Sequence, residues 1–256
     1  MKYSLLLLAF LAFFSCKKTE DSKINNVEES QTQTQTKDLR EFKVTDSKYI
    51  NVEELWKPFN KDLEDFSEAI YDQLKHLILE QDIPTLQKHI KEGKLTYEKL
   101  TKFYLYRIRK FDRNNDLSLN SVIALNPKVI EEAKQKDIEF RNKMMKRPIF
   151  GMPIFLKDNI NTTGMPTTAG AVALQNNQTE DAFIVKQLKQ QGALILGKTN
   201  LSEWANYFSE NSSNGYSAIG GQTFNPYGRR TIDTGGSSSG SGVAVASNFC
   251  AAAVGS

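Results

Sequence analysis

The sequence predicts an α/β fold preceded by a group of helices, and three observations carry that prediction. Apolar residues recur at spacings of three and four over residues 52–111, which indicates amphipathic helices. An apolar strand, a helix and a second apolar strand follow one another over residues 152–196. A Gly/Ser-rich stretch at residues 235–242 then opens a run of small apolar residues. A strand, a helix and a strand in that order predict a parallel pair with a crossing helix.

Composition places the chain among ordinary soluble globular proteins. It has 256 residues, of which 39% are hydrophobic and 25% charged, enough for one large domain or two small ones. The net charge of +3 comes with no basic stripe interleaved with aromatic residues. Nucleic acid is therefore not expected as a partner.

The first 16 residues are predicted to be an export signal. Lys2 precedes an apolar run at residues 5–14, which at ten residues is too short to span a bilayer. The run ends in Ser15 and Cys16, a pair that resembles the lipobox of bacterial lipoproteins. This resemblance implies lipid on Cys16 and a place in the bacterial cell envelope, on its periplasmic or surface side. A plain secretory signal with an incidental cysteine remains the alternative.

Residues 17–48 are predicted to be a disordered tether between membrane and domain. The stretch is polar, includes "QTQTQT", and holds too few apolar residues to offset the entropy of ordering. The folded domain is expected over residues 49–256. With Cys16 lipidated, Cys250 is left alone among apolar neighbours and is expected to be a small buried hydrophobe. Neither a disulfide nor a metal site is expected.

Helices are expected over residues 52–111. Thr96 is a candidate N-cap, and Pro58 is a candidate interruption near the start. His76 and His89 both lie in this region, so they are expected to be surface or packing residues rather than catalytic bases. The first apolar stripe comprises Leu55, Phe59, Leu63, Phe66, Ile70, Leu74 and Leu77.

Residues 112–123 begin like a calcium-binding loop, with polar side chains at alternate positions. The sixth position, where such a loop needs glycine, is Leu117, and the twelfth, where it needs a bidentate glutamate, is Ile123. Calcium is therefore excluded there.

The α/β pattern follows. We expect a strand at 152–156, a helix in "DAFIVKQLKQQG" closed by Gly192, and a strand at 193–196. Lys157 and Lys198 follow the two strands. Reactive groups collect where the strands of open α/β sheets end, so both lysines are candidates.

The loop "GGSSSGSG" from Gly235 to Gly242 allows several interpretations. A phosphate-binding loop is excluded because no lysine follows Gly235. A nucleophile elbow needs a histidine after its serine, and no histidine lies beyond His89. A flexible linker would not run into "VAVASNFCAAAV", which reads as a buried helix. A hydrolase without histidine needs another base, and neutral lysine is the usual substitute.

Three motifs in order, "GMPIFLKDNINTTGMPTTAGA", "GALILGKTNLSEWAN" and "GGSSSGSGVAVA", resemble the amidase signature family. The family consists of serine hydrolases that cleave carboxamide C–N bonds with a Ser, cis-Ser, Lys triad. The resemblance covers about residues 119–256 and is closest to the secreted peptide-amidase branch. It implies the N-terminal part of a mixed sheet flanked by helices, an amide substrate of peptide or small-molecule type, and no cofactor.

By the same match, Lys157 is the family's catalytic lysine and Ser237 its cis-Ser. Lys157 must then be neutral to take a proton, and Ser237 relays the proton from the attacking serine. Gly236 meets the need for a small residue before a cis bond. Lys198 matches a motif residue without a triad role, and the residues expected to line the loop are Gly235, Gly236, Ser238 and Ser239.

The resemblance places the nucleophilic serine about 24 residues after the cis-Ser, in a Gly-Ser turn that also forms the oxyanion hole. Ser256 is 19 positions past Ser237 (256 minus 237), so the nucleophile is expected beyond it. The sequence is therefore expected to hold two of three triad members and to be inactive as it stands. Whether it is a fragment or a truncated gene product stays open.

Two functions remain. The first is a lipid-anchored amidase represented by its N-terminal part. The second is a non-enzymatic envelope lipoprotein that keeps part of the fold as a binding module.

Overall fold

The computed structural model of the chain describes residues 46–113, 117–142, 147–208 and 212–256. All of them fall in one compact unit, Asp38–Ser256. The predicted signal peptide, Cys16 and the tether up to residue 45 lie outside the described residues. No helix in the described ranges is both long and apolar enough to cross a membrane.

The first helical region is interrupted more strongly than its apolar stripe predicts. Helix α1 (Val52–Trp56), capped by the Asn51 side chain, gives way to the 3-10 helix η2 (Lys57–Phe59), which contains Pro58. Turns follow until Ser67 caps α2 (Glu68–Ile78). Proline ends α1 because its ring cannot continue the helical hydrogen bonds, so the stripe belongs to separate short elements.

Two further helices complete this region, α3 (Ile83–Lys91) and α4 (Tyr97–Phe111). Thr96 caps α4 by accepting a hydrogen bond from the Lys99 N–H at 3.1 Å, as predicted. Both histidines lie in helices, and the His89 ring contacts the Leu77 carbonyl. The helical prediction for residues 52–111 is therefore confirmed, with a correction inside the first stretch, which is divided into separate short helices.

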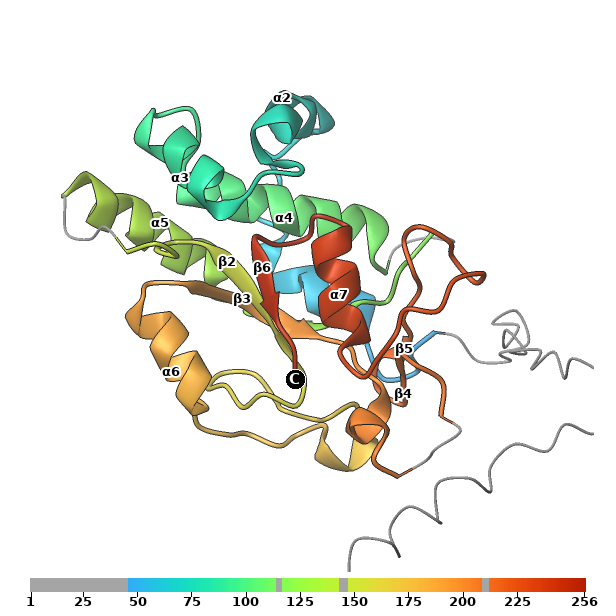
Figure 1. Ribbon diagram of the computed structural model, residues 1–256. Helices are drawn as coiled ribbons and strands as arrows, with labels where there is room; N and C mark the ends of the chain where they lie inside the picture. The colour runs from blue at the N-terminus through green and yellow to red at the C-terminus, as the bar shows by residue number, and fades with distance from the viewer. Residues whose placement is uncertain (1–45, 114–116, 143–146, 209–211) are drawn as a thin grey trace, which may run out of the picture. The chain divides into compact units, whose positions relative to one another are not determined.

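The main sheet has the strand order β1-β3-β2-β6 (Figure 1). β2 and β3 are parallel, as predicted, and α6 (Phe183–Gln190) connects them. β1 is antiparallel to β3, so the sheet is mixed, as the resemblance implies. The strands are β1 (Val122–Leu125), β2 (Pro153–Lys157), β3 (Leu194–Thr199) and β6 (Ala252–Val254).

Gly192 closes the connection after α6. Its φ of +84° lies in the left-handed region, and an added Cβ would lie 2.5 Å from a Phe150 ring carbon. Both the backbone angle and the lack of space require glycine there.

The prediction of one buried helix through "VAVASNFCAAAV" is wrong in its second half. Helix α7 (Ser239–Ala246) ends at Ser247, and Asn248 follows with a φ of +54°. The chain then turns into β6, where Ala253 pairs with Phe155 of β2. Alanines are good helix formers, but pairing with a neighbouring strand overrides that preference here.

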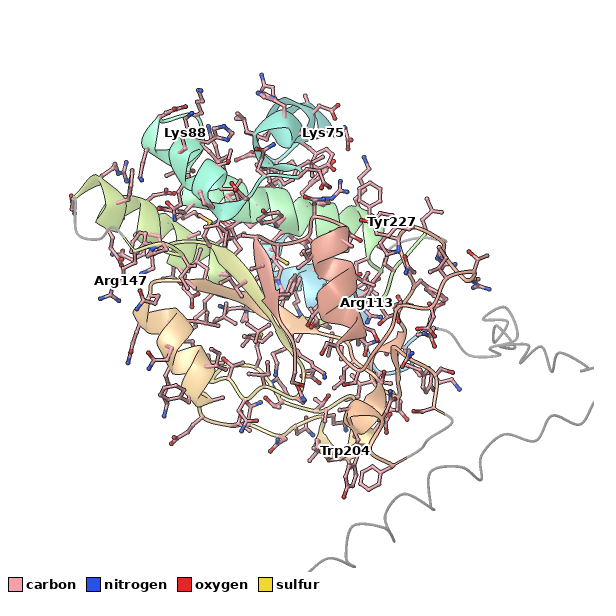
Figure 2. All side chains as sticks on the ribbon, in the orientation of Figure 1. Lys75, Lys88, Arg113, Arg147, Trp204 and Tyr227 are labelled. Carbon is pink, nitrogen blue, oxygen red and sulfur yellow. The ribbon has the colours of Figure 1, made fainter. Side chains whose placement is uncertain are left out.

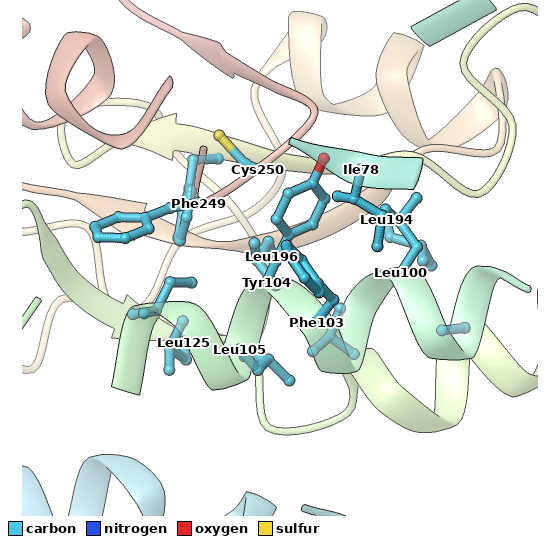
Figure 3. Close-up of a cluster of buried hydrophobic side chains, with 14 of the residues drawn as sticks. Ile78, Leu100, Phe103, Tyr104, Leu105, Leu125, Leu194, Leu196, Phe249 and Cys250 are labelled. Carbon is cyan, nitrogen blue, oxygen red and sulfur yellow. The ribbon is translucent and has the colours of Figure 1, made fainter. Parts of the chain in front are cut away.

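Helices lie on both sides of the sheet. Phe155 and Leu196 belong to a large core that includes residues of α4 and α7, whereas Leu156 and Ile195 pack with Val185 of α6. In Figure 1, α2, α3, α4 and α5 (Val129–Arg141) lie on one side of the sheet and α6 on the other. Figure 3 shows Tyr104 on the side of α4 that faces Leu194 and Leu196 of β3.

The remaining elements are short and belong to the loops beside the sheet. They are the 3-10 helices η3 (Val172–Leu174) and η4 (Glu203–Asn206) and the two-residue strands β4 (Tyr216–Ser217) and β5 (Gly221–Gln222). These loops hold the segments that reach the candidate site.

Candidate active site

Lys157 stands at the carboxyl end of β2, and its side chain is fully buried. Every residue of β2 is buried, and Lys157 pairs with Thr199 of β3. The strand therefore carries a buried amine to the edge of the sheet. Burial lowers the pKa of Lys157 below the usual lysine range because the ammonium form loses its hydration.

The Gly/Ser loop leads into α7 and presents Ser237 at its start. The peptide bond between Gly236 and Ser237 is cis, as the resemblance implies. A Cβ on Gly236 would lie 2.6 Å from Asn214 Oδ1 and 2.7 Å from Ser202 Oγ, so no larger residue fits. The Ser237 carbonyl accepts a hydrogen bond from the Ser202 N–H at 3.0 Å.

The fold brings the two predicted residues together. Lys157 Nζ donates to Ser237 Oγ at 2.7 Å, although 80 residues separate them along the chain. When the amine is neutral the direction can reverse, and the serine hydroxyl then donates to the nitrogen lone pair. A serine hydroxyl and a buried amine at this distance can exchange a proton.

Ser256 adds a second hydroxyl to Lys157, and sequence reasoning did not find it. Lys157 Nζ donates to Ser256 Oγ at 2.9 Å and to its carbonyl at 3.3 Å. Asn159 Nδ2 also donates to Ser256 Oγ, at 3.1 Å. These contacts depend on the pairing of β6 with β2, which no local pattern in the sequence indicates.

The other loop residues have distinct places. Ser238 Oγ accepts from the Ser256 N–H at 3.1 Å and donates to the Ser256 carbonyl at 3.0 Å. Ser239 Oγ donates to the Gly235 carbonyl within the loop. Gly235 has a φ of +65°, a conformation that glycine adopts readily. Ser238 therefore fixes Ser256, two residues after β6, and Ser239 fixes the loop itself.

Lys198 lies away from Ser237. Lys157 pairs with Thr199 and Leu156 pairs with Lys198, so the two lysines point to opposite faces of the sheet. Lys198 Nζ lies 3.2 Å from Asp158 Oδ1, and both side chains are fully buried. The structure therefore separates the second candidate lysine from the Gly/Ser loop.

Cys250 and a cavity among the outer helices lie apart from this site. The Cys250 thiol is free and buried, as predicted, and burial raises its pKa to about 12. A cavity of about 690 Å³ lies among the outer helices, lined by residues such as Phe66, Ile90 and Lys102. Neither Lys157 nor Ser237 lines that cavity.

Comparisons with known proteins identify the family of this chain. The amidase family model matches residues 99–256, more than half of the chain. A Schizosaccharomyces pombe protein named as an amidase is 41% identical over 175 residues, which cover 68% of this chain and 29% of that protein. The chain thus spans about a third of the length of this relative.

Solved structures of amidases also resemble this chain. An amidase family protein from Bacillus anthracis superposes with a TM-score of 0.75 and 42% identity, covering 82% of this chain and 42% of that one. The native peptide amidase from Stenotrophomonas maltophilia gives a TM-score of 0.66 and 47% identity, covering 68% of this chain and 36% of that one. On the family match and these likenesses, the chain belongs to the amidase family.

Proposed function

We propose that this chain carries the proton-transfer part of a carboxamide hydrolase, with Lys157 as general base and Ser237 as relay. One observation supports this most strongly: the buried Lys157 amine contacts the Ser237 hydroxyl at 2.7 Å. The two residues come from separate family motifs, and the fold places them within hydrogen-bond distance.

The proposed reaction uses the pair twice. The nucleophilic serine gives its proton to Ser237 Oγ while Ser237 gives its own proton to neutral Lys157, and the serine oxygen bonds to the amide carbon. Lys157 then returns a proton through Ser237 to the leaving nitrogen as the C–N bond breaks. Water hydrolyses the resulting ester by the same proton path, and this releases the acid and the free serine.

The nucleophile in this proposal is the serine that the resemblance places about 24 residues after Ser237. Ser256 is the alternative, because its hydroxyl lies 2.9 Å from Lys157 Nζ. In that case Lys157 would activate Ser256 directly, without a relay. The two versions assign the covalent intermediate to different residues, so labelling distinguishes them.

The substrate is proposed to be a carboxamide on a peptide or a small molecule. A structural relative named as a peptide amidase, at 47% identity, supports the peptide class. Incubating the protein, in a form that continues past Ser256, with peptide amides and fatty-acid amides tests the proposal. Release of ammonia or amine supports it, and binding without turnover supports the alternative of a non-enzymatic binding module.

The 256-residue sequence by itself is predicted to have no amidase activity. It supplies a base and a relay, and without the predicted nucleophile and its oxyanion donors no acyl-enzyme can form. Incubation of the purified 256-residue chain with the same amides, followed by mass spectrometry of the protein, checks this. Turnover accompanied by an acyl group on Ser256 would show that the alternative nucleophile is the correct one.

Cys16→Ala is predicted to move the protein from the membrane fraction to the soluble fraction. The prediction depends on the lipobox-like end of the apolar run, because stable membrane attachment of a soluble domain requires an anchor. Fractionation of cells expressing each form, with immunoblotting, measures the shift. Unchanged membrane partitioning of the variant would refute lipid anchoring at Cys16.

A further inference from the structure

A buried ion pair lies beside the candidate base on the other face of the sheet. Asp158 directly follows Lys157, and Asp158 and Lys198 are both fully buried and 3.2 Å apart. Burial raises the pKa of Asp158 and lowers that of Lys198, and their mutual attraction opposes both shifts. A buried pair of this kind contributes little net stability compared with apolar residues of the same size. Its presence therefore calls for a role other than stability.

Both members of the pair hold the turn at residues 166–170. Lys198 Nζ donates to Thr167 Oγ1 at 3.0 Å. Asp158 Oδ2 accepts from the Thr168 N–H at 3.2 Å, from the Thr168 hydroxyl, and from the Gly170 N–H at 3.4 Å. The Asp158 carbonyl also accepts from the Ala169 N–H at 3.1 Å.

This turn needs such support because its backbone is strained. Ala169 has a φ of +49°, which is uncommon for a residue with a Cβ. Gly170 has a φ of +78°, and a Cβ there would lie 2.5 Å from Ser217 Cβ. A residue with a Cβ rarely adopts the left-handed region, so the surrounding contacts must fix it.

The turn in turn reaches the loop that carries Ser237. The Ala169 carbonyl accepts from the Trp204 N–H at 2.9 Å, and Trp204 is labelled in Figure 2. Two residues earlier, the Ser202 N–H donates to the Ser237 carbonyl at 3.0 Å. Hydrogen bonds joined by short backbone segments therefore connect Asp158, which follows the base, to the backbone of the relay serine Ser237.

We propose that Asp158 and Lys198 are a positioning pair that fixes the Ser237 loop relative to Lys157 through the turn at residues 166–170 and the segment at residues 202–204. The expected effect on catalysis rests on the proposed function, whereas the expected effect on the position of the Ser237 loop does not. Neither residue reaches the reacting atoms. The pair acts by holding the distance between Lys157 Nζ and Ser237 Oγ.

The test replaces both charges at once. Asp158→Leu with Lys198→Met leaves no buried charge unpaired but removes the acceptor of the Thr168 and Gly170 N–H groups, so melting curves first establish that the double variant folds. Hydrogen–deuterium exchange is then measured on peptides that cover residues 200–206 and 235–242. The proposal predicts at least about tenfold faster exchange in both peptides, with the α4 peptide unchanged.

A milder variant and a matched control accompany it. Thr168→Val keeps the ion pair and the side-chain volume but removes the hydroxyl contact to Asp158, and it is expected to accelerate exchange in the same two peptides by a smaller factor. This variant decides the matter if the double variant does not fold. Leu86→Ala, in the buried face of α3, lowers stability elsewhere and should leave both peptides unchanged at a temperature well below melting.

Activity gives a separate readout in a form that continues past Ser256. A displaced relay should lower kcat about 10²-fold with little change in KM, because substrate contacts are not removed. Unchanged exchange at residues 200–206 and 235–242 in a folded variant would overturn the proposal. Faster exchange in a protein that hydrolyses no amide would support the positioning link and refute the proposed function instead.

Discussion

Replacing Lys157 with Met is expected to lower kcat for amide hydrolysis by a factor of about 10³ or more. Lys157 Nζ, at the end of β2, contacts Ser237 Oγ and could accept its proton. The change removes that amine. Methionine is chosen because the site is fully buried and its side chain fills most of the volume of lysine. Steady-state kinetics on a form that continues past Ser256 measure the loss.

The control for this variant is Lys186→Met on α6, where the lysine side chain is exposed. It should change kcat by no more than about twofold, because surface substitutions remote from a site have small effects. Melting curves establish that Lys157→Met is folded. Near-normal turnover by a folded Lys157→Met protein would remove Lys157 from the mechanism and leave amide hydrolysis without its proposed base.

Replacing Ser237 with Ala is expected to lower kcat by a factor of about 10² to 10³, with KM changed by no more than a few-fold. The hydroxyl transfers protons in the proposed path and does not hold the substrate. Rates over a range of substrate concentrations separate kcat from KM. An effect confined to KM would instead place Ser237 in substrate binding.

Ser247→Ala is the matched control for loss of a serine hydroxyl. Ser247 follows α7, and its buried Oγ has no hydrogen-bond partner in the part of the chain that the structure describes. Its removal leaves no partner unsatisfied, so activity and stability should stay close to those of the parent. A comparable loss of kcat in this variant would point to general damage around α7 rather than to a relay.

Local sequence patterns predicted those helices and strands that depend on residues close together in the chain. The spacing of apolar residues in α4 and the Thr96 cap follow from neighbours within a few residues, and both were correct. β2 and β3 were placed to within a few residues because each begins with a short apolar run. Pairing far along the chain could not be predicted in this way. "AAV" at residues 252–254 became β6 because β2 offers it a parallel partner, not because alanine favours strands.

Some features of the candidate site could be predicted from motifs, and others depend on contacts between distant parts of the chain. Family motifs identified Lys157 and Ser237 but contained no distance between them, which the sheet and the Gly/Ser loop supply. The contacts of Ser256 and Asn159 with the lysine region arise from the position of β6. The position of Lys198 near the end of a strand left it a candidate, and only the family motif marked it as a residue without a triad role. The shift in register between β2 and β3 places it on the face opposite Lys157.

The most direct test of the proposed Lys157–Ser237 proton path is the site and rate of labelling by a serine-directed phosphonate, in a form that continues past Ser256. The labelling rate should rise with pH and then reach a plateau. Because burial lowers the pKa of Lys157, the midpoint of that rise should lie below the ordinary lysine pKa of 10.5. Below that midpoint Lys157 is an ammonium ion and cannot accept a proton, so labelling slows. The proposal predicts a single labelled serine after Ser256 and loss of this pH-dependent rate in Lys157→Met. Labelling of Ser256, or labelling at the parent rate without Lys157, would contradict it.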